Sequence, residues 1–197
     1  MLINPLDYNI SELSNATLQK GSLLLSEPFL IDYNFKRSVI LVIEHDENGS
    51  LGFVLNKPLN LNINEVLLDF PDINCEVYKG GPVQSNHLFF LHKMGDVLDN
   101  SLHIIDDLYW SGDFDQIKFM ANNNLIKPED IKFFLGYSGW EPQQLDNEIS
   151  ADSWIITNYD KKLIWETNPD KLWKEALKKM GPKQAQLANF PEDPNLN

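Results

Sequence analysis

Polar side chains that could do chemistry stand at the ends of the predicted strands, where rigid scaffolds commonly place binding groups. A histidine there could act as a general base near neutral pH, and an arginine could bind an anion. The set comprises Arg37, Glu44, His45, Asn56, His92, Asp113 and Gln144, joined by Gly80, Gly81, Pro82 and Trp140. We predict a binding site among these residues and assign no catalytic residue. The alternative for each is that it satisfies only a local backbone group or a neighbouring charge.

Arg37 is the only arginine among 16 basic residues. Because lysine meets every other need for positive charge, an isolated arginine indicates that a planar group with several donors is required. Two partners are open: the carboxylate of Glu44, or the anionic group of a ligand.

Several common catalytic signatures are absent. The run GYSG at 136 to 139 resembles a nucleophile elbow, but Trp140 replaces the second glycine of that motif. Neither of the two familiar glycine-rich nucleotide loops occurs. His87 and His92 are an odd number of residues apart on one predicted strand and should face opposite ways, and Cys75 is the only cysteine. We therefore expect no metal site, no cofactor and no disulfide.

A β-hairpin is predicted to position the first of these residues. Residues 39 to 43, VILVI, form a short run that is apolar on both faces, which is typical of a strand covered on both sides. Asn48-Gly49 favours a turn within a loop of about five residues, and the chain returns as a strand over 51 to 56. Glu44 and His45 should then face opposite sides, unless a bulge intervenes.

The remaining elements are predicted from periodicity and from Gly, Pro and capping signals. Short helices are expected at 64 to 70, with Asn64 as cap, and near 143 to 148. Longer helices are expected at 114 to 123, capped by Asp113, and at 168 to 180, capped by Asn168. Further strands are expected at 22 to 26, 77 to 78, 88 to 92, 103 to 110, 131 to 137, 154 to 157 and 163 to 165.

Length and composition indicate one domain. A chain of 197 residues with 43% hydrophobic content can bury a substantial core, and alternating helix and strand signals favour the α+β class. We expect an N-terminal arm over residues 1–19, a single domain over 20–183, and a flexible polar tail over 184–197.

The net charge of −13 argues against direct binding to nucleic acid, because most of the molecule repels phosphate. Only the region from Lys171 to Lys183 offers a basic patch, and the simpler explanation is the solvated face of a helix. No run approaches the length of a membrane span, and no secretion signal is evident. These features predict a cytoplasmic protein that does not enter membranes.

Longer stretches of the chain extend these motifs. GSLLLSEPFL at 21 to 30, FKRSVILVIEH and GSLGFVLNKP between 35 and 58, GGPV at 80 to 83, FFLH at 89 to 92, SGD at 111 to 113 and FLGYSGWEPQQLDNE at 134 to 148 occur in this order. Together they resemble the YqgE/AlgH family, also called UPF0301, over roughly residues 20 to 180. The resemblance implies a bacterial cytosolic α+β protein whose branched, mostly antiparallel sheet curls into a pseudo-barrel flanked by helices. Two departures are Ser111, where glycine is frequent, and Asp146, where glutamate is common.

The resemblance implies a transcriptional-regulator label for one branch of the family and supplies no catalytic residues. We therefore predict a non-enzymatic binding or regulatory module that acts through an unknown protein or small-molecule partner. The alternative is a hydrolase or transferase that uses His45 or His92 as general base.

Overall fold

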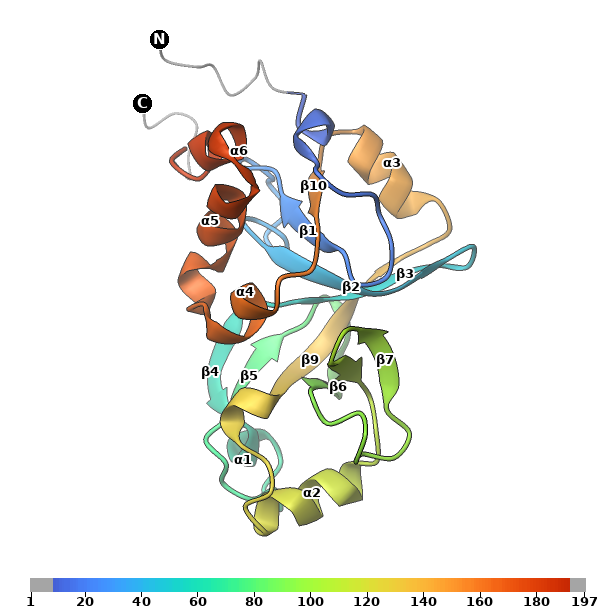
Figure 1. Cartoon of the computed structure of the whole chain (residues 1–197), viewed down its shortest axis with the longest axis vertical. Helices are drawn as coiled ribbons and strands as arrows, with labels where there is room; N and C mark the ends of the chain where they lie inside the picture. The colour runs from blue at the N-terminus through green and yellow to red at the C-terminus, as the bar shows by residue number, and fades with distance from the viewer. Residues whose placement is uncertain (1–8, 192–197) are drawn as a thin grey trace.

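The computed structural model describes residues 9–191, which form two lobes joined by a long central strand (Figure 1). The strands are β1 (Leu23–Ser26), β2 (Val39–Asp46), β3 (Gly49–Val54), β4 (Pro58–Asn62), β5 (Glu76–Lys79), β6 (Val83–His92), β7 (Leu102–Ile105), β8 (Leu108–Trp110), β9 (Ile131–Trp140) and β10 (Trp154–Thr157). The helices are α1 (Ile63–Val66), α2 (Phe114–Asn122), α3 (Gln144–Ser150), α4 (Lys161–Glu166), α5 (Pro169–Met180) and α6 (Pro182–Leu187), with 3₁₀ turns at Ser11–Leu13 and Pro128–Asp130.

The predicted α+β class and the branched, mostly antiparallel sheet are confirmed. The strands follow the order β10-β1-β2-β3-β9-β6-β8-β7, and β4 and β5 form a branch beside β9. Strand β9 has β6 on one side along its length, whereas its other side pairs first with β5, in parallel, and then with β3. The sheet is not closed into a barrel.

The upper lobe explains why its strands are apolar without interruption. Leu23, Leu25 and Leu41 pack in one cluster with residues of α4, α5 and α6, whereas Leu24 and Ile40 pack in another with Leu145 of α3 and Trp154. Figure 1 shows the corresponding layers, with β1 and β10 between α5 and α6 on one side and α3 on the other. Successive side chains of a strand point to opposite faces, so both faces must be apolar.

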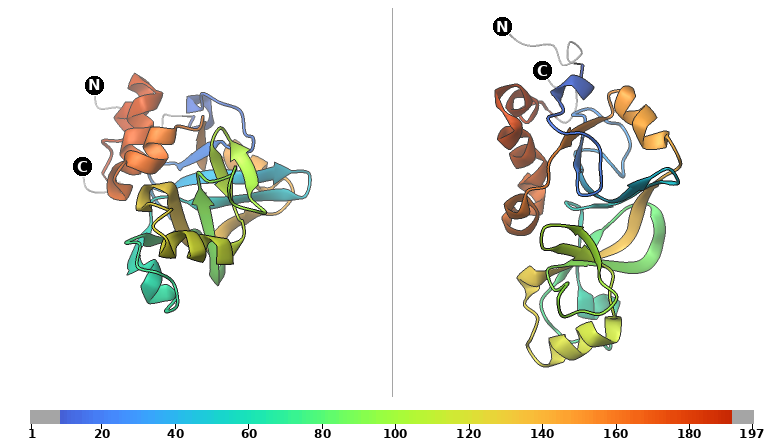
Figure 2. Two further views of the ribbon diagram at one scale, coloured as in Figure 1. Left: turned by 60° about the horizontal axis from the view of Figure 1, so that its bottom comes forward. Right: turned by 45° about the vertical axis from the view of Figure 1, so that its right-hand side comes forward.

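Strand β9 joins this lobe to the lower one. Phe134 belongs to the cluster beneath α5, and Trp140 belongs to the cluster beneath α3. Phe133, one residue before Phe134, lies in the core of the lower lobe with Ile117 and Ala121 of α2. The right-hand view in Figure 2 shows the lower lobe, with α1 and α2, below β2 and β3. The side chains of a single strand therefore enter three hydrophobic clusters.

Four predicted elements differ from the structure. The hairpin loop is shorter than expected, because β2 extends to Asp46 and β3 begins at Gly49. Residues 103 to 110 form a tight hairpin, β7 and β8, that turns where Asp106 adopts a φ of 48°. Residues 163 to 165 lie in α4, whose capping residue Asp160 accepts from the Leu163 N–H. Strand β9 runs past the predicted end at residue 137 and continues to Trp140.

Smaller corrections concern helix ends and the chain termini. Helix α1 is capped by Asn62 and not Asn64, and the backbone N–H of Asn62 donates to Glu65. The cap of α2 by Asp113 and that of α5 by Asn168 are confirmed. Helix α6 runs into the segment predicted as a polar tail, and Leu187 and Ala188 are buried there. The rest of the tail, 192–197, and residues 1–8 of the predicted arm lie outside the described residues.

Candidate ligand-binding cleft

A cleft of about 600 Å³ opens where the β2–β3 hairpin meets the end of β9 and the start of α3. Its shape depends on close backbone contact: Gly49 adopts a φ of 130°, and a Cβ on it would collide with the carbonyl oxygen of Trp140. The lining residues are Glu44, Asp46, Asn48, Gly49, Ser50, Leu51, Val83, Tyr137, Gly139, Trp140, Glu141, Pro142 and Gln144. Three of the predicted site residues, Glu44, Trp140 and Gln144, thus share one cleft.

A β-bulge at Ile43 sets the arrangement of the hairpin residues. The register shifts between Val42 and Glu44, so Glu44 pairs with Leu51 and His45 with Ser50. His45 Nδ1 lies 2.8 Å from the Ser50 hydroxyl. The bulge therefore places His45, through Ser50, beside the cleft that Glu44 lines.

Two indole N–H groups donate hydrogen bonds to one carboxylate, that of Glu148. Glu148 Oε2 accepts from Trp140 Nε1 at 2.9 Å and from Trp154 Nε1 at 2.8 Å. The other oxygen of Glu148 accepts from Gln144 Nε2, and Gln144 Oε1 accepts from the backbone N–H of Glu141. This network fixes the Trp140 ring and the Gln144 amide, and α3 positions it.

The electrostatic character of the cleft is anionic. Glu44, Asp46 and Glu141 are exposed carboxylates at its lining, and the described residues that line it include no lysine, arginine or histidine. Tyr137 supplies aromatic surface, and Ser50, Asn48 and Gln144 supply polar groups. The Trp140 ring is buried in the cluster with Leu145 and Trp154. Such a site favours a cation that carries hydrogen-bond donors.

Arg37 and Asn56 lie elsewhere and have mainly structural partners. Arg37 does not pair with Glu44: its Nη2 donates to the carbonyls of Phe190 and Pro191, each at 2.7 Å. Its guanidinium also lies over the ring of Trp173, 5.0 Å from the centroid. Asn56 is buried, accepts from the Val39 N–H and donates to the Arg37 carbonyl, which ties the hairpin ends together.

His92 and Asp113 are also separate from the cleft. His92 is fully buried; its Nδ1 accepts from the Met94 N–H, so Nε2 carries the proton and donates to the Ser111 carbonyl at 2.8 Å. Burial lowers the pKa of His92 below its usual value. With both ring nitrogens bonded to the backbone, His92 is poorly placed to act as a general base.

The Gly80-Gly81-Pro82 turn allows backbones to approach closely. A Cβ on Gly80 would collide with the Gly136 carbonyl oxygen, and one on Gly81 with the backbone of Tyr137. The Gly80 carbonyl accepts from the Val54 N–H and from the Ser138 hydroxyl. Of this run, Val83 is the residue that lines the cleft.

Sequence reasoning missed several residues of the cleft. Asp46 and Glu141 directly follow the predicted site residues His45 and Trp140 but carried no separate signal. Ser50 and Tyr137 have no predicted site residue beside them in the chain. Glu148 stands one helical turn after Gln144, and this i, i+4 spacing is the signal that could have linked it to Gln144 and Trp140.

Two further properties of the described residues concern membranes and metal ions. No helix in residues 9–191 has the length and hydropathy needed to cross a membrane. The same residues contain no group of three or more His, Cys, Asp or Glu side chains arranged to hold a metal ion.

The family model described as AlgH-like matches residues 23–185. A UPF0301 protein of Cytophaga hutchinsonii is 42% identical over 181 residues, which cover 91% of this chain and 100% of that protein. A UPF0301 protein of Bacteroides fragilis is 42% identical over 186 residues, which cover 93% of this chain and 94% of that protein.

Two solved structures show the same fold. The solution structure of the AlgH protein from Pseudomonas aeruginosa has a TM-score of 0.72 and 30% identity, covering 90% of this chain and 97% of that one. A crystal structure of a Corynebacterium diphtheriae protein has a TM-score of 0.77 at 20% identity, covering 96% of this chain and 100% of that one. The match to the family model, the curated relatives and the shared fold agree, and the chain therefore belongs to the AlgH-like family.

Proposed function

We propose that this protein is a non-enzymatic binding module whose cleft receives a basic segment of a partner protein. The observation that carries the proposal is the lining itself: three carboxylates and the partly exposed Tyr137 border about 600 Å³ without a basic side chain among the described lining residues. Lysine and arginine side chains satisfy both features, because they bind carboxylates and stack on aromatic faces.

The rigidity of the cleft supports recognition. Glu148 holds the Trp140 indole, and the close contact at Gly49 fixes the hairpin against β9. A preformed site loses little conformational entropy when a ligand binds. A regulatory role, which family resemblance suggests, would run through this partner in the cytoplasm, and the net charge of −13 argues against direct contact with DNA.

The test is an NMR titration of the ¹⁵N-labelled protein with acetyl-Gly-Lys-Gly-Arg-Gly-amide at low salt. We expect saturable shifts at the Trp140 indole N–H and the 44–51 hairpin. In the double variant Glu44→Gln/Glu141→Gln, affinity should fall at least tenfold.

A matched control distinguishes local contacts from overall charge. The variant Glu12→Gln/Glu166→Gln removes the same charge at exposed positions outside the cleft lining and should bind as the unmodified protein does. Equal losses in both double variants, or equal binding of a peptide with glutamine in place of lysine and arginine, would overturn the proposal.

A second candidate function rests on the pair of His45 and Ser50. Their 2.8 Å contact is within the range in which a histidine can activate a hydroxyl nucleophile. This arrangement supports acyl transfer at the cleft with Ser50 as nucleophile. Hydrolysis of p-nitrophenyl acetate by the purified protein that disappears in Ser50→Ala and in His45→Gln would support it, and an unchanged rate in Ser50→Ala would eliminate it.

A further inference from the structure

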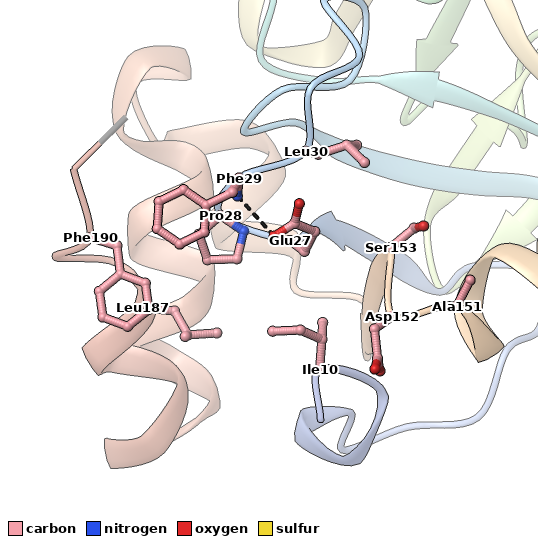
Figure 3. A pocket seen from close by; sticks show the side chains of 10 residues that line it. All are labelled: Ile10, Glu27, Pro28, Phe29, Leu30, Ala151, Asp152, Ser153, Leu187 and Phe190. Carbon is pink, nitrogen blue, oxygen red and sulfur yellow. Dashed lines mark hydrogen bonds between the residues drawn. The ribbon is translucent and has the colours of Figure 1, made fainter. Parts of the chain in front are cut away.

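A second cavity, of about 310 Å³, lies between α6 and the α3–β10 connection (Figure 3). It is bordered by four segments that are distant in sequence. The lining residues are Ile10, Glu27, Pro28, Phe29, Leu30, Ala151, Asp152, Ser153, Leu187 and Phe190. None of them lines the cleft between the β2–β3 hairpin and the end of β9, called the acidic cleft below.

Most of this cavity is apolar. Phe29 and Phe190 stack with their ring centroids 5.8 Å apart at an interplanar angle of 16°. Leu187 is fully buried and Ile10 nearly so. Figure 3 shows the side chains of Ile10 and Leu187 pointing toward one another below Glu27. A small hydrophobic body would be shielded from water by these walls.

Glu27 places a carboxylate at this apolar space. One of its oxygens, Oε2, accepts from the Phe29 N–H at 2.9 Å, and no second donor to this carboxylate occurs within residues 9–191. The carboxylate is half-buried, and the loss of solvation raises the pKa of Glu27 above its usual value. Asp152 likewise has one bonded oxygen, because its Oδ1 accepts from the Ser11 N–H at 2.7 Å. Glu27, two residues before Phe29, is the acceptor beside the stacked aromatic rings.

The cavity walls are fixed by a network around β1 and α5. The backbone of Ser26, which precedes Glu27, accepts from Trp173 Nε1 at 2.9 Å. The Ser26 hydroxyl accepts from the Ser38 N–H at 3.0 Å. Arg37 donates to the carbonyls of Phe190 and Pro191 and so holds the Phe190 wall in place. This organisation gives Arg37 a positioning role at the cavity.

We propose that this cavity binds a small primary ammonium compound with an apolar body, such as an alkylamine or arylalkylamine. The ammonium group would donate to the free oxygen of Glu27, and the hydrophobic body would lie against Phe29, Phe190 and Leu187. A carboxylate in place of the ammonium would be repelled by Glu27 and by Asp152. The volume is at the lower end of the range for small-molecule sites, which suits a single ring or a short chain.

The probe for this proposal is 2-phenylethylamine, compared with 2-phenylethanol and 3-phenylpropanoate by NMR titration of the ¹⁵N-labelled protein. We expect the amine to shift signals of residues 27–30, 151–153 and 187–190, and to bind at least tenfold more tightly than the alcohol. The carboxylate should not bind. Equal affinity of the amine and the alcohol, or amine shifts confined to the 44–51 hairpin, would overturn the proposal.

Variants separate this cavity from the acidic cleft. Glu27→Gln should abolish the preference for the amine over the alcohol, whereas Glu141→Gln, in the cleft, should leave it unchanged. Arg37→Lys should weaken binding of the amine and of the alcohol by the same factor, since Arg37 positions Phe190 and does not touch the ligand. Retention of the full amine preference in Glu27→Gln would refute the assignment even if the basic peptide binds the cleft.

Discussion

At the residue scale, Arg37 stabilises backbone carbonyls and an indole ring. Its guanidinium donates to two successive carbonyls while lying over Trp173, which a lysine ammonium cannot do with the same geometry. The prediction that an isolated arginine serves a planar, multi-donor role holds for these carbonyls. The sequence suggested two other partners, Glu44 and a ligand anion. It did not suggest these carbonyls, because nothing in the sequence indicates that residues 190 and 191 lie beside Arg37.

Glu27 should reduce stability at neutral pH. A carboxylate with a raised pKa binds protons more readily in the folded chain, so its contribution is favourable at low pH and becomes unfavourable as pH rises through the folded pKa. Asp152 is the other titratable side chain that borders the cavity. We expect Glu27→Gln to raise the melting temperature at pH 8 by about 1–2 °C, since solvent access keeps the effect small.

Calorimetry at pH 8 and at pH 4 measures this effect. The difference between Glu27→Gln and the unmodified protein should become small at pH 4, which lies below the ordinary pKa of 4.5, because Glu27 is then mostly protonated in both the folded and unfolded states. The exposed control Glu166→Gln should change little at either pH. A melting temperature lowered by Glu27→Gln at pH 8 would contradict the prediction.

His92 should make the fold sensitive to mild acid. Its folded-state pKa is depressed by burial, so the stabilisation is complete above the unfolded value of 6.5 and is lost as pH falls toward the folded pKa. The group faces the Ser111 carbonyl, the Met94 N–H and the ring of Tyr109. The unfolding free energy should fall below pH 6.5 by at most about 1.4 kcal/mol per pH unit from this residue.

Urea unfolding between pH 7.5 and 5.5 provides the measurement. His92→Gln should be less stable at pH 7.5 and should lack this part of the pH dependence. His87→Gln, which changes an exposed histidine, should retain it. An identical pH slope in His92→Gln would show that His92 is not responsible.

At the element scale, the Gly80-Gly81 turn determines how closely β6 and β9 approach. Gly81 has a φ of 159°, and a Cβ would collide with the carbonyl of Tyr137. Gly81→Ala should therefore lower the unfolding free energy by about 3 kcal/mol, as measured by urea denaturation.

Gly139→Ala is the matched control for this substitution. Its Cβ would meet side-chain atoms and no backbone, Tyr137 at 3.1 Å and Val83 at 3.7 Å, and Gly139 is exposed. We expect a loss below about 1 kcal/mol there. Comparable losses in the two variants would mean that the backbone contact at Gly81 does not limit stability.

Local patterns predicted those elements whose signals are self-contained. The apolar run 39 to 43 and the cap-to-glycine pattern of α5 identified a strand and a helix correctly. Residues 163 to 165 are apolar, which fits a buried strand as well as a buried helix. The Asp160 cap, which begins the helix, was not recognised in the sequence. Gly136 and Gly139 weaken a strand, but tertiary pairing with β3 and β6 keeps β9 extended.

The candidate site was predictable only in part, for a comparable reason. Glu44, Trp140 and Gln144 were selected singly, whereas their meeting in one cleft depends on the bulge at Ile43 and on β3–β9 pairing. Neither feature has a local sequence signal. The cavity at Glu27 depends on contacts between residues more than 100 positions apart, so no local pattern indicated it.

At the scale of the whole molecule, the two lobes should unfold together. Strand β9 sends Phe133 into the lower core and Phe134 and Trp140 into the two upper clusters, so loss of one cluster disrupts the others. Cys75 reports on the lower lobe: it is buried, and desolvation raises the pKa of its thiol to about 12. Trp140, Trp154 and Trp173 report on the upper lobe.

The experiment compares tryptophan fluorescence with the alkylation of Cys75 by iodoacetamide across a urea gradient. We expect coincident midpoints, within about 0.2 M, and negligible alkylation of the native protein. Cys75→Ala serves as the blank for labelling. Cys75 labelling that begins at clearly lower urea than the fluorescence change would show that the lobes unfold separately.

The two hydrogen bonds from Arg37 to the carbonyls of Phe190 and Pro191 constrain when the second cavity can form during biosynthesis. Its donor and acceptors are 153 and 154 residues apart, so the ribosome must have added residues 38 to 191 after Arg37 before both bonds can form. Until then Phe190 cannot stack on Phe29, and the wall of the second cavity is missing. A newly made chain therefore acquires this wall only after residues 190 and 191 have been synthesised, so residues 27 to 30, which border the cavity, are made well before it is complete.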